Sequence, residues 1–485
     1  TCGLGNMRPA MMNGGGNKGE TPMKIKVQIM IEHEGEDKPI MEEICCLCRG
    51  DLLPETVGLT LNEGKELLAK LQEKMVTHQA NKFVEQQRYC PNCGQIRHNK
   101  GKHDIIYRSV FGKLHISSPR LYTCPCQEQQ KLSFSPLAER LPERTAPELR
   151  YLQTKWASLM SYGLTVDLLE EVLPLQTSIT SVIRHIHETA KKLDMELGNE
   201  QAVFIEGCER DWEALPDPDE PLAVGIDGGY VHAREGENRK AGWFEVIVGK
   251  SIPENGETKR FASVNNYDQK PRRRVFEMLK NQGLQMNQNI IFLSDGGDTV
   301  RDLQLYLSPQ AEHLLDWFHI TMRITAMRQM AKGLPTDTKT LPDVAAELER
   351  IKWYLWHGNV FRALQEIEDL MFDFDCYEGK SSSMKKLGKA IGEFFHYISV
   401  NRDFIPNYSE RHRYGEKIST AFVESTVNEV ISKRMVKKQQ MRWTKQGAHL
   451  LLQVRIQTLN EELKDTFCQW YPEMEPETED FLKAA

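Results

Sequence analysis

Residues 222–233, LAVGIDGGYVHA, and residues 287–298, NQNIIFLSDGGD, decide the fold of this chain. In each stretch a short apolar run ends in Asp-Gly-Gly, and the two acids are Asp227 and Asp295. Short apolar runs of this kind are typical of strands buried in a sheet. Asp-Gly alone is ordinary turn chemistry, but two copies that each close a buried strand favour a shared site. Neighbouring strands would bring both carboxylates to one sheet edge, close enough to share divalent cations.

The segments around these two stretches predict an α/β domain. Residues 241–252 and 260–267 have the composition of two further strands, and a helix is expected to begin near Pro271. A helical segment follows Asp295, and residues 311–320, AEHLLDWFHI, form a short strand that continues into a helix. The predicted order is therefore β-β-β-α-β-α-β-α.

A third acid is expected from a helix packed against the same edge. Glu424, in FVEST, lies in an amphipathic segment that follows a long helical region. Glu429 comes five residues later, about 140° around a helix, so both acids cannot face the same ions. For each, an ordinary exposed helix glutamate is the alternative. Asp316 and His319 share a helix face and could act as a pair, although spacing alone favours an Asp N-cap with a structural histidine.

Clustered cysteines predict a structural zinc site. Eight of the 11 cysteines precede residue 127, and in a reducing compartment such pairs indicate zinc ligands. Residues 89–127 place two pairs around short alternating segments, as in a zinc ribbon. The favoured ligands are Cys90, Cys93, Cys124 and Cys126. Cys45 with Cys48 is the competing second pair, and unligated buried thiols are the remaining alternative.

Two regions predict contact with DNA. Three helices are expected between Pro147 and about Glu200, in a helix-turn-helix arrangement whose last helix presents Arg184 and His185. Three-helix packing without DNA is the alternative. The net charge is −7, yet no carboxylate lies between Glu429 and Glu461, which suits a polyanion held at one face. The cations predicted to bind DNA there are Lys433, Arg434, Lys437, Lys438 and Arg442, with Lys445 and Arg455 in the same stretch.

The 485 residues are expected to form several domains. No apolar run is long enough to span a membrane, and the leader lacks a secretory signal, so a cytoplasmic protein is expected. The predicted parts are a disordered leader (1–24), an N-terminal helical region (25–86), a zinc ribbon (87–130), a helix-turn-helix-like domain (131–215), an α/β core (216–335 and 410–460), an all-helical insertion (336–409) and an acidic tail (461–485).

Taken together, GIDGGYV, LSDGGD, LDWFHI and the segment from FVEST to LLLQVR resemble bacterial insertion-sequence transposases of the Kra type. The resemblance covers about residues 87–460 and departs from the pattern in the short second cysteine pair. It implies a Mutator-like DDE enzyme with a ribonuclease H-like catalytic domain and an all-helical insertion. It also implies a triad of Asp227, Asp295 and Glu424 that binds two Mg²⁺ or Mn²⁺ ions, with a D-x-x-H motif at Asp316 and His319.

The activity that the resemblance implies is metal-dependent cleavage of insertion-element ends, followed by transfer of the 3′-hydroxyl into target DNA. The implied partners are the terminal inverted repeats and target DNA, bound by a homo-oligomer. Two other functions remain compatible with the residues. One is a sequence-specific DNA-binding regulator with an inactive nuclease-like domain. The other is a ribonuclease H-like nuclease that does not transfer strands.

Overall fold

The computed structural model divides the chain into two compact units, Thr1–Leu149 with Asp167–Thr177, and Arg150–Val166 with Ser178–Ala485. Within the described residues, no helix is long and apolar enough to cross a bilayer. The structure describes residues 23–32, 39–50, 52–127, 132–218, 222–234, 242–253, 256–334, 343–377, 381–436 and 441–474, without the side chains of 298 and 299.

The first unit begins with a two-stranded hairpin rather than a helical region. Residues 25–31 lie in β1 and residues 40–49 in β2, so the predicted helical region is wrong there, because Ile25, Val27 and Ile29 alternate with polar residues at the strand period. Met23 and Lys24 of the predicted leader begin β1, and the rest of that leader lies outside the described residues. The elements of this unit are β1 (Met23–Ile31), β2 (Ile40–Arg49), α1 (Leu61–Gln87), β3 (Asn99–Ser109), β4 (Gly112–Tyr122), β5 (Ser133–Phe134) and α2 (Pro136–Arg140).

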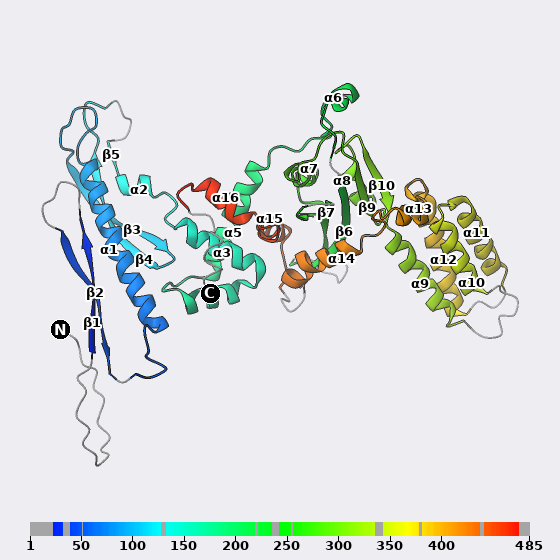
Figure 1. The fold of residues 1–485 in the computed structure, drawn as a ribbon, viewed down its shortest axis with the longest axis horizontal. Coiled ribbons are helices and arrows are strands. Elements are labelled where there is room, and N and C mark those ends of the chain that lie inside the picture. The colour runs from blue at the N-terminus through cyan, green and yellow to red at the C-terminus, as the bar shows by residue number, and fades with distance from the viewer. Residues whose placement is uncertain are drawn as a thin grey trace, which may run out of the picture. The chain divides into compact units, whose positions relative to one another are not determined.

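The second unit is built on a five-stranded sheet in the order β10-β9-β6-β7-β8 (Figure 1). β10, β9 and β6 are parallel, whereas β7 and β8 are antiparallel to their neighbours. The predicted element order, and with it the mixed α/β fold, is confirmed. The strands are β6 (Leu222–His232), β7 (Trp243–Ile252), β8 (Lys259–Val264), β9 (Ile290–Ser294) and β10 (Ala311–Leu315).

Helices cover both faces of this sheet. One face packs Val224, Ile226 and Phe292 against α7 (Pro271–Asn281) and α8 (Asp298–Gln304). The other face buries Val246 and Val248 in a core that also holds residues of the predicted helix-turn-helix. The helices on this face are α3 (Pro147–Leu159), α5 (Ile179–Glu196), α14 (Ala421–Val427), the π-helix η2 (Asn428–Val436), α15 (Lys445–Leu459) and α16 (Leu463–Trp470), while α4 (Tyr162–Val172) and α6 (Glu209–Glu213) lie between them in sequence.

The remaining helices form a block with its own core between β10 and α14. Leu348, Ile367 and Phe394 are buried there, and Tyr408 Oη donates a hydrogen bond to Leu315 O of β10 at 2.7 Å. The predicted acidic tail is partly wrong, because α16 buries Leu463 in the sheet-covering core. The block consists of α9 (Trp317–Ala331), α10 (Val344–Trp356), α11 (Val360–Cys376), α12 (Ser382–Val400), η1 (Arg402–Phe404) and α13 (Tyr408–Arg413).

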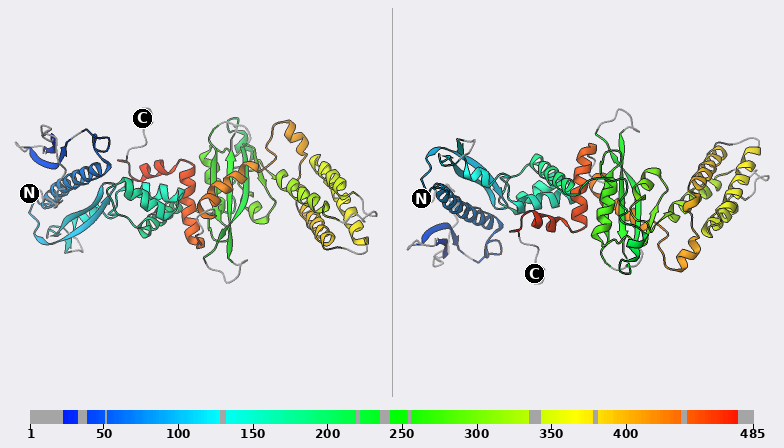
Figure 2. Two further views of the ribbon diagram at one scale, coloured as in Figure 1. Left: turned by 90° about the horizontal axis from the view of Figure 1, so that it is seen from below. Right: turned by 90° about the horizontal axis from the view of Figure 1, so that it is seen from above.

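Two glycines of β6 let α14 and η2 lie directly on the strand (Figure 2). A Cβ at Gly225 would collide with Val423, and one at Gly229 would lie 2.6 Å from Ile431 Cδ1. Residues 225, 227 and 229 point to the same face, since side chains alternate along a strand. The close approach therefore places α14 on the face to which Asp227 points.

We expect Gly225→Ala to destabilise the protein by about 1–3 kcal/mol, because the added methyl group overpacks the contact between β6 and α14. The measurement is the midpoint of denaturant unfolding. Gly163→Ala is the control, since no atom lies within 4 Å of its Cβ position and alanine favours the helix. Equal midpoints for the Gly225 variant and the unaltered protein would contradict the packing argument.

Candidate functional site

Asp227 lies in β6, and Asp295 directly follows β9, the adjacent parallel strand. β6 and β9 pair from Leu222↔Ile290 to Gly225↔Leu293, and the same register continued by two residues sets Asp295 beside Asp227. Both acids are half-buried. Their carboxylates accept hydrogen bonds from nearby amides, at 2.7 Å from Gly228 N and at 3.0 Å from Gly297 N.

The electrostatics around Asp227 favour a cation. Burial raises the pKa of Asp227, the charges of Asp295 and Asp316 add to that rise, and the Gly228 amide and His319 oppose it. Carboxylate oxygens are the ligands that Mg²⁺ and Mn²⁺ prefer, so these two acids suit a divalent ion. A bound cation would relieve the repulsion between the carboxylates.

Glu424 comes to this region on α14. Val423, its neighbour in sequence, packs on Gly225 of β6, and Glu424 itself is exposed. Asp227, Asp295 and Glu424 do not bring three oxygens within 4.8 Å of one another, since the only such ligand group among the described residues is formed by cysteines. The acids come from three elements: Asp227 from the middle of β6, Asp295 from the residue after β9, and Glu424 from the helix that packs on β6.

Asp316 is a fully buried carboxylate that links α9 to the start of α14. It caps α9 through Phe318 N at 2.9 Å, and it also accepts hydrogen bonds from the backbone amide and hydroxyl of Thr420, the residue before α14. His319 Nδ1 donates to the same carboxylate at 2.7 Å. Burial raises the pKa of Asp316, but the hydrogen bonds from His319 and Thr420 outweigh it, so the net shift is downward.

The hydrogen bond to Asp316 leaves the other ring nitrogen of His319 free to act toward the acids. Burial lowers the pKa of His319, but the hydrogen bond and charge of Asp316, with the charges of Asp227 and Asp295, raise it overall. A cationic imidazolium beside the carboxylates is therefore favoured. Asp316 has no oxygen left for an ion, so its contribution is to orient His319 and to hold the start of α14.

Tyr397 contacts the backbone of Asp295, and Arg323 packs on Tyr397. Neither residue was identified from the sequence. Tyr397 Oη donates to the backbone oxygen of Asp295 at 3.0 Å, and the Arg323 guanidinium lies 4.2 Å from the Tyr397 ring centre. Burial raises the pKa of Tyr397 well above its usual range. Tyr397 is 102 residues from Asp295, so no local motif could have identified the contact.

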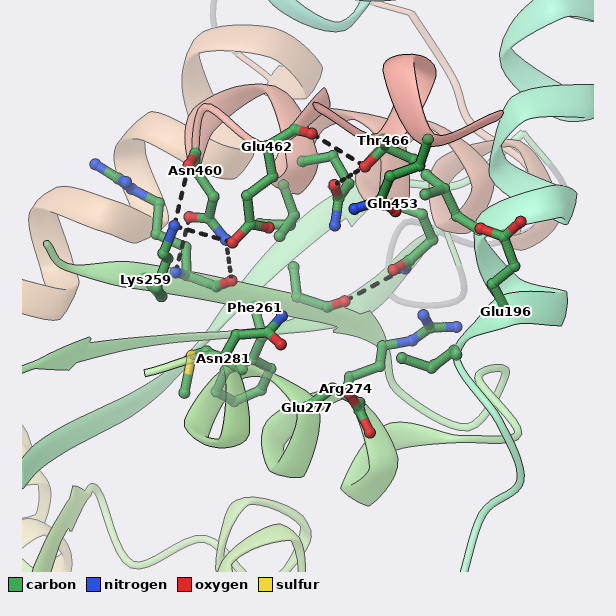
Figure 3. Close-up of a pocket in the computed structure, with 18 residues that line it drawn as sticks. Glu196, Lys259, Phe261, Arg274, Glu277, Asn281, Gln453, Asn460, Glu462 and Thr466 are labelled. Carbon is green, nitrogen blue, oxygen red and sulfur yellow. Dashed lines mark hydrogen bonds and ion pairs between the residues drawn. The ribbon is translucent and has the colours of Figure 1, made fainter. Parts of the chain in front are cut away.

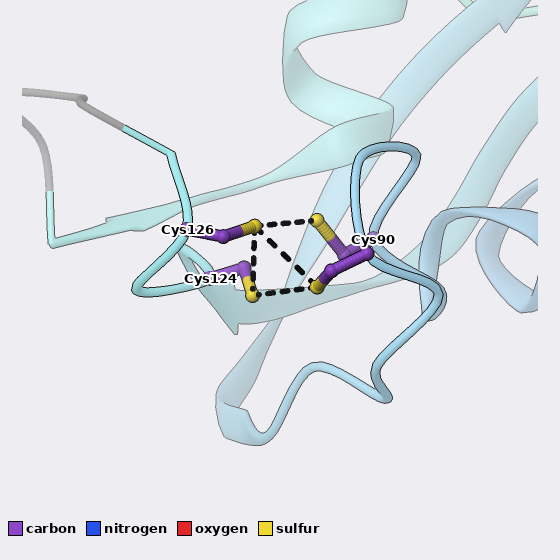
Figure 4. A group of neighbouring side chains, drawn as sticks. Cys90, Cys124 and Cys126 are labelled. Atoms are coloured by element: carbon purple, nitrogen blue, oxygen red, sulfur yellow. Dashed lines mark hydrogen bonds between the residues drawn. The ribbon is translucent and has the colours of Figure 1, made fainter.

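Four cysteines of the first unit gather their thiols into one group (Figure 4). The sulfur atoms lie within 4.8 Å of one another, and Cys90 Sγ is 3.4 Å from Cys126 Sγ. Gly94, at φ 71°, turns the first knuckle so that its amide donates to Cys90 O. The four residues, Cys90, Cys93, Cys124 and Cys126, could hold a metal ion.

The chemistry of this group suits zinc. Burial opposes ionisation of Cys90, but hydrogen bonds from the Cys93 and Asn92 amides lower its pKa to about 6. Contacts with the other thiols raise the pKa of Cys126, so a bound cation is needed to hold all four as thiolates. Cys45 and Cys48, the competing pair, lie in β2, outside the group.

Of the two residues predicted on the recognition helix, only Arg184 is exposed. His185 is 2% exposed and its Nδ1 hydrogen-bonds Gln153 Oε1, so the expectation that it reads DNA is wrong. The cause is the helical period, which turns His185 to the same side as the buried Val182 and Thr189.

The basic stretch contains two buried arginines, so it is not a uniform surface strip. Arg434 is 1% exposed, donates from Nε to Ala157 O at 3.0 Å, and lies over the Trp443 ring at 5.3 Å. Arg455 is also buried; burial lowers its pKa to about 10, and it donates to Glu429 O and Val430 O in η2. The predicted DNA-binding role of Arg434 is therefore wrong. Trp443 is also buried.

The other basic side chains leave a smaller cationic surface. Lys433, Arg442 and Lys445 are exposed and available to a polyanion. Lys437 and Lys438 lie outside the described residues.

A separate cavity of about 220 Å³ lies between β8, α7, α15 and α16 (Figure 3). Lys259 at its rim pairs with Glu462 at 2.9 Å, and Gln453 donates to Ala262 O at 3.4 Å. None of the candidate acids lines it. These internal pairings make the cavity part of the packing around the sheet.

No protein-family model matches this chain, and no curated protein matches it. Among solved structures it is similar to the Drosophila P element transposase strand transfer complex, with a TM-score of 0.30 and 10% identity over 66% of this chain and 93% of that one. It is also similar to NurA with manganese, with a TM-score of 0.10 and 13% identity over 51% and 74% of the two chains. TM-scores this low establish no shared fold.

We expect purified protein to hold about one zinc ion per chain, because four thiolates complete a tetrahedral site. Cys93→Ser should remove the metal, as measured by elemental analysis after gel filtration. Cys48→Ser is the matched control and should retain it. Zinc loss on Cys48→Ser with retention on Cys93→Ser would reverse the ligand assignment.

Replacing Asp316 with Asn should destabilise the second unit by at least about 2 kcal/mol, because one amide group cannot accept all the hydrogen bonds that the buried carboxylate accepts. Denaturant unfolding measures the change. Asp373→Asn, at an exposed position of α11, should shift stability by less than about 0.5 kcal/mol. A similar small shift for both variants would reject the linking role of Asp316.

Proposed function

We propose that this chain is a DNA transposase of the DDE class, of the bacterial Kra-type, Mutator-like kind. One observation carries the proposal: Asp227 in β6 stands level with Asp295, the residue after the parallel strand β9, and α14, which carries Glu424, packs on the face of β6 to which Asp227 points. Two acids from neighbouring strand segments and one from a packed helix form an arrangement suited to divalent ions.

The topology supports a ribonuclease H-like catalytic domain. Three antiparallel strands come first and two parallel strands follow on the other side of β6, giving the order β10-β9-β6-β7-β8. The helical block α9–α13 lies in sequence between β10 and α14, and its helices α10–α13 would form an all-helical insertion before the third acid. This order supports the position of Glu424 as the last member of the triad.

The acids would hold two Mg²⁺ or Mn²⁺ ions, and such ions supply activation of a nucleophilic oxygen and stabilisation of the leaving oxygen. Asp227 and Asp295 would provide ligands from the sheet, and Glu424 would provide the third from α14. His319, positioned by Asp316, would place a positive charge beside the DNA phosphate that lies between the acids. Tyr397 would hold the Asp295 backbone in position.

The proposed reaction has two steps at this one site. Water would cut the DNA at the ends of the insertion element and free a 3′-hydroxyl, which would then attack target DNA. The carboxylates would keep their charge throughout, so no covalent protein intermediate is required. A homo-oligomer would hold the terminal inverted repeats and the target together.

The other parts would bind and position DNA. We propose that the four-cysteine group is a zinc ribbon, and that α3, α4 and α5 form a helix-turn-helix-like region with Arg184 at its DNA-facing side. Lys433 and Arg442, with Lys437 and Lys438, would neutralise backbone phosphates near the acids. Exposure of Arg184, Lys433 and Arg442 supports these roles.

Asp227→Asn, Asp295→Asn and Glu424→Gln should each lower the rate of DNA cleavage and strand transfer by orders of magnitude, because each removes a ligand charge from residues that act as a unit. The assay combines purified protein, Mg²⁺ or Mn²⁺, labelled element-end DNA and a target plasmid. Glu429→Gln is the control: its carboxylate accepts from Arg260 Nε at 3.0 Å, a bond that an amide oxygen can also accept, so activity should change little.

The products decide between the three candidate functions. Joined products that disappear in Asp295→Asn support a transposase. Cut ends that are never joined would indicate a nuclease without strand transfer. Specific DNA binding with no metal-dependent cutting under any condition would indicate a regulator and would contradict the proposal.

A further inference from the structure

β6 and β7 extend beyond the sheet edge that carries the acids. β6 pairs with β9 only as far as Gly225, whereas its pairing with β7 continues to His232, opposite Trp243. Asp227 stands where this two-stranded part, here named the β6–β7 extension (residues 228–232 and 243–247), begins. From Asp227 to His232 the extension is about 16 Å long, at about 3.3 Å per residue.

The two faces of the extension have different environments. On one face Val231 and Val246 are fully buried, in the core shared with η2 and α15. On the other face Tyr230 is 61% exposed and Trp243 is 43% exposed. Tyr230, His232 and Trp243 share this open face, because side chains alternate along each strand and His232 pairs with Trp243.

The ring of Trp243 is held in place although it is exposed. His232 and Trp243 form a cross-strand pair with ring centres 4.7 Å apart and planes at 65°. The buried opposite face and the strand register fix the backbone beneath them. An indole held on a rigid strand loses little conformational freedom on binding, so it offers a ready stacking surface.

A cavity of about 590 Å³ opens beside Trp243. Its size lies in the range of small-molecule sites. Lys445, the first residue of α15, brings a positive charge to it, and Asn265 Nδ2 donates to Glu245 Oε2 at 2.6 Å within it. Flat rings, amide groups, one cation and the carboxylate of Glu245, which Asn265 holds, therefore line a single space. The lining includes Trp243, Glu245, Asn265, Asn266, Tyr267 and Lys445.

We propose that the open face of the β6–β7 extension, with this cavity, binds unpaired nucleotides of the DNA strand whose phosphodiester is processed at the acids. The proposal rests on the proposed function, since that function places a DNA strand at Asp227. Only an unpaired base offers its face to an indole, because bases in a duplex already stack on each other. Lys445 and Arg442 neutralise the phosphates of the bound strand.

The dimensions and composition favour a nucleic acid over a protein partner. The extension matches about five stacked bases at about 3.4 Å each. Two exposed rings beside amides and cations form a small, mixed surface, whereas a stable protein interface buries about 800 Å² on each side. Asp227 points to the opposite face of β6 from Tyr230, but among the described residues β6 has no strand partner on the β9 side beyond Gly225. The DNA strand therefore passes from the acids around this edge of β6 to Tyr230 and Trp243.

The test compares binding of a labelled single strand and of the duplex of the same sequence by the full-length protein, without divalent ions, using fluorescence anisotropy. Trp243→Ala should weaken single-strand binding about tenfold or more and leave duplex binding unchanged. Trp243→Phe should restore most of the affinity, and Tyr230→Ala should cause a smaller loss. Trp353→Ala, at a 50% exposed position in α10, is the control and should change neither.

Equal effects of Trp243→Ala and Trp353→Ala, or equal losses for strand and duplex, would overturn the proposal. If Trp243→Ala does not fold, as judged by its thermal midpoint, Tyr230→Ala decides, and unchanged single-strand binding by that variant rejects the site. The cleavage assay separates the two proposals. Trp243-dependent strand binding without metal-dependent cutting rejects only the catalytic function, and cutting with Trp243-independent binding rejects only the nucleotide site.

Discussion

A single buried carboxylate, that of Asp316, connects the helices beside the candidate acids. Asp316 has no exposed surface, and its hydrogen bonds reach α9 through Phe318, His319 on the same helix, and Thr420 at the start of α14. A buried charge is tolerated only when its hydrogen bonds are made, so these elements must come together for any one of them to be stable there. The position of Glu424 thus depends on a residue that cannot itself bind an ion.

The second constraint is the lack of a Cβ atom at two positions of β6. Gly225 and Gly229 remove the Cβ atoms that would separate the strand from Val423 and Ile431. The two constraints act at successive points of one segment, since Thr420 is held by Asp316 and Val423 then packs on the strand. Together they set the level of α14 along β6, and with it the position of Glu424 relative to Asp227.

The strands of the second unit could be predicted because apolar runs closed by Gly or Asp have a strong local signal. The separation of Asp227 and Asp295 in sequence equals that of the paired residues of β6 and β9, such as Leu222 and Ile290. The β1–β2 hairpin could have been predicted from its alternation. Burial of Arg434 and Arg455 could not, because charge patterning assigns arginine to the surface. Each guanidinium group instead donates to backbone carbonyls, including those of η2 for Arg455, and only the folded chain brings these carbonyls near. Tyr397 was beyond prediction for the same reason, since its partner is distant in sequence.

The hydrogen bond from Tyr397 to the Asp295 backbone has an evolutionary consequence. The helical block begins and ends beside the sheet, which would make it a segment that recombination could exchange between related proteins. Because α12 contacts the backbone of Asp295 itself, an exchanged block must supply an equivalent donor at the same place. The block and the end of β9 are therefore expected to be inherited together. Sequence divergence in α12 is then constrained by its contact with the end of β9, although the two segments are distant in sequence.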